Sequence, residues 1–420
     1  MSETPPSSTN AAAEALDPPV WRRGKPWIVG AAIVLLLGIL LAVFLPFHRH
    51  PDERALNELG FIKGTCSDSD GAASAPDDCL ALRAQPTLTA SQVAAAIPHL
   101  KNADVKIQLN LAGTQVDNLA SVGELDNLES LDLTSTPVWN IDALKGARSL
   151  KRLVLHRTEV ENIDALKGMT ALQSLNLWDT RVANLDALKN LSDLRQLDLR
   201  DTQVRDLDPL EDLPHLDTLK LGGARNVRNV DALSQLTALT TLDLNETQVE
   251  SIGALKKLRD MQALYLANTP LRDIDVLKQM PALKTLVLDG SKVGNIDALR
   301  GLTQLDTLVL ARTQVTDIEA LQGLTRLQRL NLADTRVENI DALKDLKSLR
   351  MLNLFRTQVR NVDALKGLTG LQELYLANTP IENTDALKGL SGLRELVLYG
   401  TKTRNVDDLK TALPKTRIVW

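Results

Sequence analysis

A 22-residue unit repeats through most of this chain and constrains its fold more than any other feature. Each copy contains two leucines separated by one residue, as at Leu175 and Leu177. The second leucine recurs every 22 residues, apart from one interval of 23 between Leu221 and Leu244. One unit alone is too short to bury its apolar side, whereas stacked copies share a continuous core. The second leucines are Leu111, Leu133, Leu155, Leu177, Leu199, Leu221, Leu244, Leu266, Leu288, Leu310, Leu332, Leu354, Leu376 and Leu398.

Alternating residues within each unit predict a short β-strand. We expect Leu175 and Leu177 to face the core, and Asn176 and Trp178 to face the opposite side of the strand. Three positions after the second leucine most copies have threonine, whose hydroxyl is expected to hydrogen-bond nearby backbone. Nine positions after it most have aspartate, as at Asp186. We interpret this aspartate as the N-cap of a short helical turn, and metal binding by the row of aspartates is the alternative.

The pattern resembles the internalin-like class of bacterial leucine-rich repeat proteins. The matching features are L-x-x-L-x-L and the following V-x-x-I-x-x-L, as in residues 327–348, although threonine replaces the family's usual asparagine at the turn. The resemblance covers residues 105–420. It implies an α/β solenoid of horseshoe form, with a parallel concave β-sheet and short helical or 3-10 turns on the convex side. It also implies that the concave face binds other macromolecules.

A second strong signal is the uncharged run at residues 27–47. Its length matches the roughly 20 residues that cross a bilayer as a helix, so we predict a transmembrane signal anchor, with a cleaved signal peptide as the alternative. The cluster of Arg22, Arg23 and Lys25 before it favours a cytoplasmic N-terminus and periplasmic or extracellular repeats. The Ser/Thr/Pro/Ala-rich segment 1–26 is then a disordered cytoplasmic tail.

Residues 48–104 are predicted to be a linker and an N-terminal cap. Cys66 and Cys79 are the only cysteines, and in an oxidising compartment we expect them to form a disulfide. Two free cytosolic thiols are the alternative. Thr89 and Gln92 have the spacing of a capping box that opens a helix over the first coil. At the other end, residues 418–420 are predicted to form a final capping strand, with the Trp420 indole covering the last coil.

The binding surface is predicted from the few aromatic residues on the concave side. Tyrosine, tryptophan and arginine dominate binding hot spots, although aromatic residues also simply suit strands. We expect partner contacts from Phe355, Tyr375 and Tyr399 on adjacent strands, from Arg329, Met351 and Arg356 beside them, and from Trp178 and Tyr265 elsewhere on this face.

The sequence favours a binding protein over an enzyme. The repeats contain no phosphate-binding loop or metal motif, and no serine or cysteine with a base at a predictable distance, so neither a catalytic site nor a cofactor is predicted. The net charge of −5 argues against nucleic acid as a partner. We therefore predict a membrane-anchored, extracytoplasmic scaffold that binds a protein on its concave face. The alternative is a cell-envelope or adhesion protein that binds glycans.

Overall fold

A computed structural model describes residues 52–67, 78–101 and 103–420 of the chain. The predicted cytoplasmic tail (1–26) and transmembrane segment (27–47) lie outside these residues. None of the helices within the described ranges has the length and hydropathy that a membrane span requires.

The repeats stack their strands side by side into one 17-stranded sheet. Strand β1 is antiparallel to β2, and every later strand is parallel to its predecessor in the chain. The repeat period sets the register, since the first leucine of one coil pairs with that of the next, as Leu308 does with Leu330. The strands are β1 (Phe61–Lys63), β2 (Cys79–Ala84), β3 (Lys106–Asn110), β4 (Leu128–Asp132), β5 (Arg152–Val154), β6 (Ser174–Asn176), β7 (Gln196–Asp198), β8 (Thr218–Lys220), β9 (Thr241–Asp243), β10 (Ala263–Tyr265), β11 (Thr285–Val287), β12 (Thr307–Val309), β13 (Arg329–Asn331), β14 (Met351–Asn353), β15 (Glu373–Tyr375), β16 (Glu395–Val397) and β17 (Arg417–Val419).

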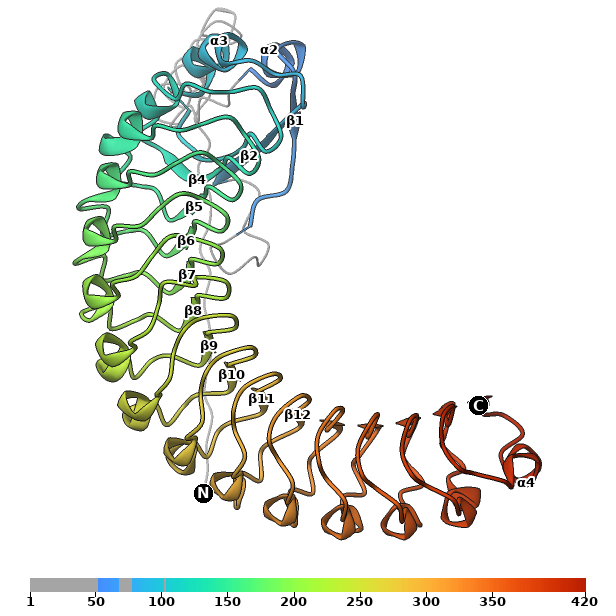
Figure 1. Cartoon of the computed structure of the whole chain (residues 1–420). Helices are drawn as coiled ribbons and strands as arrows, with labels where there is room; N and C mark the ends of the chain where they lie inside the picture. The colour runs from blue at the N-terminus through green and yellow to red at the C-terminus, as the bar shows by residue number, and fades with distance from the viewer. Residues whose placement is uncertain (1–51, 68–77, 102) are drawn as a thin grey trace, which may run out of the picture. The chain divides into compact units, whose positions relative to one another are not determined.

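The described residues form the predicted curved solenoid, with the sheet on its inner side and 3-10 helices on its outer side (Figure 1). A single hydrophobic core runs through it from Leu56 to Leu413. All fourteen second leucines are at most 1% exposed. The 3-10 helices are η1 (Val122–Glu124), η2 (Asp142–Gly146), η3 (Asp164–Leu166), η4 (Asp186–Leu188), η5 (Asp208–Leu210), η6 (Asp231–Gln235), η7 (Gly253–Lys257), η8 (Asp275–Gln279), η9 (Asp297–Leu299), η10 (Glu319–Leu321), η11 (Asp341–Leu343), η12 (Asp363–Leu365) and η13 (Asp385–Gly389).

The predicted N-cap role of the repeated aspartates is wrong. Asp186 is the first residue of η4, and its own N–H donates to the side-chain oxygen of Asn184 at 2.6 Å. The same bond recurs in every coil from η2 to η13, with asparagine, aspartate or serine as the acceptor. The aspartate carboxylate instead pairs with a cation three residues later in several coils, as Asp186 does with Lys189.

The threonine row behaves as predicted. In eleven coils the threonine hydroxyl donates to the carbonyl oxygen of the second leucine, at 2.6–2.8 Å. This bond satisfies a buried carbonyl as the strand ends. In the coil of β11 the residue is Ser291, which is buried and whose hydroxyl oxygen has no hydrogen-bond partner among the described residues.

The N-terminal end of the core is covered by helices α2 (Glu53–Glu58) and α3 (Ala90–Leu100) and by the hairpin of β1 and β2 (Figure 1). The Thr89 N–H donates to the Gln92 side chain at 3.0 Å, as the capping-box pattern predicts. Cys66 and Cys79 are joined by a disulfide.

The C-terminal end differs from the prediction. The final strand β17 is present, but the Trp420 indole is 65% exposed and does not cover the core. In the last coil, helix α4 (Val406–Ala412) stands where the preceding coils have a 3-10 helix. Its Leu409 is buried against the preceding coil. The Lys410 ammonium lies 4.8 Å from the centroid of the Trp420 ring.

Candidate functional site

The concave surface is organised in rows, because equivalent residues of successive coils lie side by side in register. Within a coil, the residues before and after the first leucine face outward, as do the two after the second leucine. The last of these four has a positive φ in all fourteen coils, between 53° and 77°. Glycine tolerates this backbone region, whereas most other residues are strained there by about 1–2 kcal/mol.

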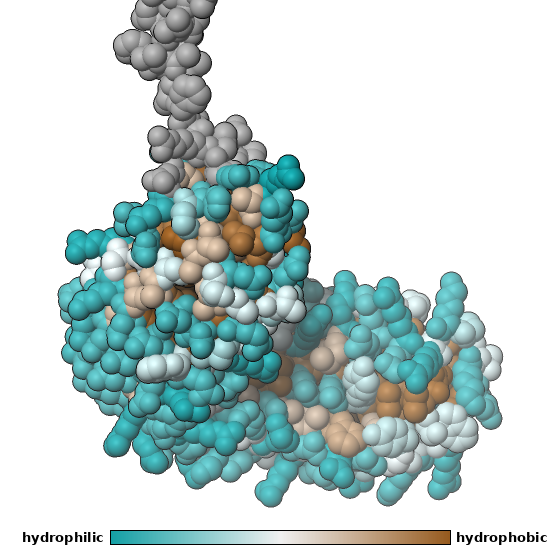
Figure 2. All heavy atoms as spheres, turned by 90° about the horizontal axis from the view of Figure 1, so that it is seen from above, coloured by the Kyte–Doolittle hydropathy of each residue, from teal (hydrophilic) through white to brown (hydrophobic). Residues whose placement is uncertain are grey.

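Phe355 and Tyr399 contact each other across an intervening coil. Their ring centroids are 6.5 Å apart and the rings are tilted by 57°. The coil between them has Ala377 in the same row, and this alanine is 1% exposed. The two rings therefore meet above a small residue and form an apolar surface, with Tyr399 still 45% exposed. Figure 2, viewed from above, shows brown hydrophobic side chains among the teal ones on the right-hand part of the solenoid.

Tyr375 lies on the strand between them but belongs to a different row. Its hydroxyl donates to the carboxylates of Glu373 at 3.2 Å and Glu395 at 3.3 Å. Burial and these two negative charges raise the pKa of Tyr375 to about 12. Glu395 is also paired with Arg417 at 3.1 Å. The three aromatic residues expected to act together on adjacent strands therefore separate into a pair of rings, Phe355 and Tyr399, and a tyrosine whose hydroxyl is held by two carboxylates.

Of the three other residues predicted here, Arg329 lies on β13, and Met351 and Arg356 belong to the same coil as Phe355. The Arg356 guanidinium lies 5.2 Å from the centroid of the Phe355 ring and 3.6 Å from the Asp334 carboxylate. Arg329 on β13 is in register with Met351 on β14. Six of the eight predicted contact residues therefore gather on the C-terminal coils. We name them the C-terminal patch: Arg329, Met351, Phe355, Arg356, Tyr375 and Tyr399.

Trp178 belongs to a separate cluster near the N-terminal end of the sheet. His156 stacks on its indole with ring centroids 4.1 Å apart, and the Arg200 guanidinium lies 4.0 Å from the ring centroid. These residues occupy the same row in consecutive coils, so the two contacts cover opposite faces of the indole. Arg200 is fixed by Asp198 at 2.6 Å, and the Trp178 Nε1–H donates to Asp201 at 2.9 Å.

Tyr265 stands apart from both clusters. On β10 it is in register with Asp243 on one side and Val287 on the other. Burial raises the pKa of Asp243 above its usual value, partly offset by the backbone N–H of Asn245 and by Arg200. Within the part of the chain that the structure describes, no second aromatic ring pairs with that of Tyr265.

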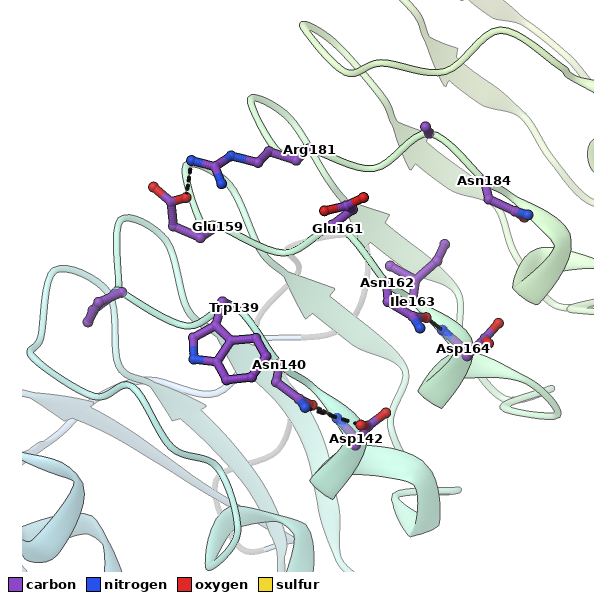
Figure 3. Close-up of a pocket in the computed structure, with 12 residues that line it drawn as sticks. Trp139, Asn140, Asp142, Glu159, Glu161, Asn162, Ile163, Asp164, Arg181 and Asn184 are labelled. Atoms are coloured by element: carbon purple, nitrogen blue, oxygen red, sulfur yellow. Dashed lines mark hydrogen bonds and ion pairs between the residues drawn. The ribbon is translucent and has the colours of Figure 1, made fainter.

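A hollow on the side of the solenoid was not predicted. It has a volume of about 770 Å³ and is lined by three consecutive coils, in the segments 137–142, 159–164 and 181–184 (Figure 3). Trp139 stands in it with 65% of its surface exposed. The sequence signal for this hollow is the residue six positions after the second leucine. This residue is Trp139 here, whereas the neighbouring coils have Asp117, Glu161 and Ala183.

Within the described ranges, no cluster of three or more histidine, cysteine, aspartate or glutamate side chains has the geometry of a metal site. The repeated aspartates are spaced along the convex side and take part in the turn bonds described above.

Comparison with known proteins agrees with the repeat pattern. A family model for two copies of a leucine-rich repeat matches residues 237–279, 303–345 and 325–367. No curated protein sequence matches the chain.

Among solved structures, an internalin from Listeria monocytogenes is similar, with 26% identity and a TM-score of 0.69 over 70% of this chain and 87% of its own. A leucine-rich repeat protein from Leptospira interrogans has 19% identity and a TM-score of 0.69 over 88% of this chain and 99% of its own. The ectodomain of a plant receptor kinase from Arabidopsis thaliana has 21% identity and a TM-score of 0.58 over 81% of this chain and 43% of its own. That ectodomain is in complex with a partner named Casparian strip integrity factor 2.

Proposed function

The chain is similar to the bacterial internalin-like leucine-rich repeat proteins, and on that premise we propose that its C-terminal patch binds another protein. The observation that carries the proposal is the contact between Phe355 and Tyr399 on an open sheet surface. Neither ring belongs to the leucine core, so folding does not require them. Exposed aromatic pairs rimmed by polar groups are typical of interaction sites.

Charged groups support the same surface. Arg356 holds its guanidinium beside the Phe355 ring and the Asp334 carboxylate. The rim also carries Glu373, Glu395 and Arg417, which can donate and accept hydrogen bonds at the edge of an interface.

A protein partner fits this surface better than a nucleic acid. The whole chain has a net charge of −5, so it lacks the excess of lysine and arginine that phosphate backbones require. The plant ectodomain of similar fold is in complex with a factor, which is consistent with a solenoid that binds a polypeptide. A glycan remains the second candidate, since sugar rings also stack on aromatic side chains.

We propose further that the solenoid lies outside the cytoplasm, tethered by residues 27–47. The disulfide between Cys66 and Cys79 supports this, because disulfides persist in oxidising compartments. Alkaline phosphatase fused after Gly60 should be active in a bacterial host, since the enzyme needs an oxidising compartment. Activity of a cytoplasmic reporter alone at that position would contradict the proposed location.

Partner capture tests the binding proposal itself. The full-length protein and its Phe355→Ala/Tyr399→Ala variant should be used side by side as bait, with Lys366→Ala on the convex side as the matched control. We expect a protein retained by the wild type and by the control but lost with the double variant. Equal recovery with all three baits would place binding elsewhere, and retention of an oligosaccharide instead of a protein would favour the glycan candidate.

A further inference from the structure

The hollow around Trp139 has features of a binding site that is independent of the concave face. Trp139 lies between two hollows, one of about 770 Å³ towards the next coil and one of about 350 Å³ towards the preceding coil. Its position in other coils is taken by small or charged residues such as Ala183 and Glu161, so the fold does not require an indole there. Exposed tryptophan is costly to solubility and is enriched at binding hot spots.

The larger hollow is negatively charged. Its lining has four carboxylates, Asp142, Glu159, Glu161 and Asp164, and one guanidinium, that of Arg181, which gives a net charge of −3. Arg181 is paired with Glu159 (Figure 3). Asp164 is paired at 2.8 Å with Lys167, which does not line the hollow.

Two of the four carboxylates have no cationic partner among the described residues. Asp142 accepts a hydrogen bond from the amide of Asn140 at 3.1 Å, and Glu161 on the next coil makes no ion pair. An exposed indole therefore stands next to two carboxylates that can each accept further hydrogen bonds. The carboxylates disfavour anionic ligands. A ligand with a planar cation can stack on the indole and also donate hydrogen bonds to the carboxylates.

A second tryptophan of this chain, Trp178, has a carboxylate and also a cation beside its indole. On the concave face, the Arg200 guanidinium covers the Trp178 indole at 4.0 Å while Asp198 holds it with hydrogen bonds of 2.6 and 2.9 Å. Indole, carboxylate and guanidinium are all supplied by the chain there. At Trp139 the indole and the carboxylates are present, and among the described residues no arginine or lysine covers the ring.

We propose that the hollow around Trp139 is a second binding site, which takes an arginine side chain from a basic peptide segment of a partner. The guanidinium stacks on the indole, and its N–H groups donate to the carboxylates of Glu161 and Asp142. Arginine suits this site better than lysine, because a flat guanidinium can stack on a ring and hydrogen-bond in its plane at the same time.

The test uses an acetylated triarginine amide as the probe, titrated calorimetrically into the full-length protein. A tricitrulline peptide of the same shape removes the charge. We expect the wild type to bind triarginine at least tenfold more tightly than tricitrulline, and Trp139→Ala to weaken triarginine binding at least fivefold. Glu161→Gln should weaken it severalfold without removing the indole. Trp420→Ala is the matched control, since Trp420 has the same 65% exposure, and it should change affinity less than twofold.

Several results would overturn the proposal. They are no binding of triarginine by the wild type, equal loss in the Trp139→Ala and Trp420→Ala variants, or equal affinity for triarginine and tricitrulline. Binding of chitotriose that depends on Trp139, in the absence of triarginine binding, would identify a carbohydrate site instead. None of these outcomes depends on the C-terminal patch, so the two sites can fail separately.

Discussion

Phe355 and Tyr399 are 44 residues apart in the chain, yet their ring centroids lie 6.5 Å from each other. The rings can approach each other because they occupy the same row two coils apart. The coil between them has only the methyl group of Ala377 in that row. The apolar surface of the C-terminal patch depends on this alternation of large and small side chains.

This ring contact should be measurable as a coupling energy. In a double-mutant cycle of Phe355→Ala and Tyr399→Ala, we expect the losses in free energy of unfolding to be non-additive by about 0.5–1.5 kcal/mol, as for other aromatic pairs. Urea melts of the four proteins supply the measurement. The pair Phe355→Ala and Tyr265→Ala is the control, and it should be additive because those rings do not meet. Additivity in both cycles would show that the first two rings do not interact.

The facing of the strands is tested by two adjacent residues on one coil. Leu310 is fully buried and Val309 is partly exposed on the concave surface. Leu310→Ala should lower the free energy of unfolding by about 2–5 kcal/mol, because it leaves a cavity in the core. Val309→Ala should cost less than about 1 kcal/mol. Similar losses in chemical denaturation would mean that the sheet is displaced by one residue.

Ser291 offers a stabilising substitution. Its buried hydroxyl has no partner, whereas threonine at this position in eleven other coils donates to the leucine carbonyl. In Ser291→Thr the added methyl restricts the side-chain rotamer, so the hydroxyl can bond to the Leu288 carbonyl. We expect a gain of about 0.5–1.5 kcal/mol. Thr335→Val removes the equivalent bond and should cost a similar amount. A lower melting temperature for Ser291→Thr would show that this coil has no room for threonine.

Tyr375 should make stability depend on pH in the alkaline range. Its pKa is raised to about 12, and the unfolded value is near 10. Between these two pH values the unfolded chain loses the phenolic proton while the folded chain keeps it. The contribution of Tyr375 to the free energy of unfolding is therefore fully present below pH 10 and is lost as the pH rises towards 12. Absorbance at 295 nm should show one tyrosine ionising near pH 12 while circular dichroism still reports the folded state, and Tyr375→Phe should abolish that transition. Its persistence in the variant would assign it to another tyrosine.

The periodic part of the fold could be predicted because every copy repeats the same interactions. The spacing of Leu308 and Leu330 sets the strand register, and the threonine row repeats one backbone bond. The cap of the 3-10 helices was misassigned because Asn184 and Asp186 both suit a helix start, and only the backbone path shows which side chain meets a free N–H.

Several features that occur only once were not predicted. A repeat pattern does not reveal that Tyr375 turns its hydroxyl to Glu373, since that depends on a rotamer choice among neighbours on different strands. Trp139 was not singled out because its exposure depends on how the loops of three coils are spaced. Trp420 lies 22 residues after the last of the second leucines, and its indole was expected to cover the end of the core. Helix α4 covers that end instead.

The most direct test of the account is calorimetric titration of the captured partner into variants of the C-terminal patch. Phe355→Ala and Tyr399→Ala should each weaken binding by about 2 kcal/mol or more, roughly a 30-fold rise in Kd. Each variant should stay folded and lose little more free energy of unfolding than the roughly 0.5–1.5 kcal/mol of the ring contact. Lys366→Ala on the convex side should leave Kd within about a factor of two, as expected for a change of a few tenths of a kcal/mol. Unchanged affinity in both aromatic variants would contradict the assignment of binding to the C-terminal patch.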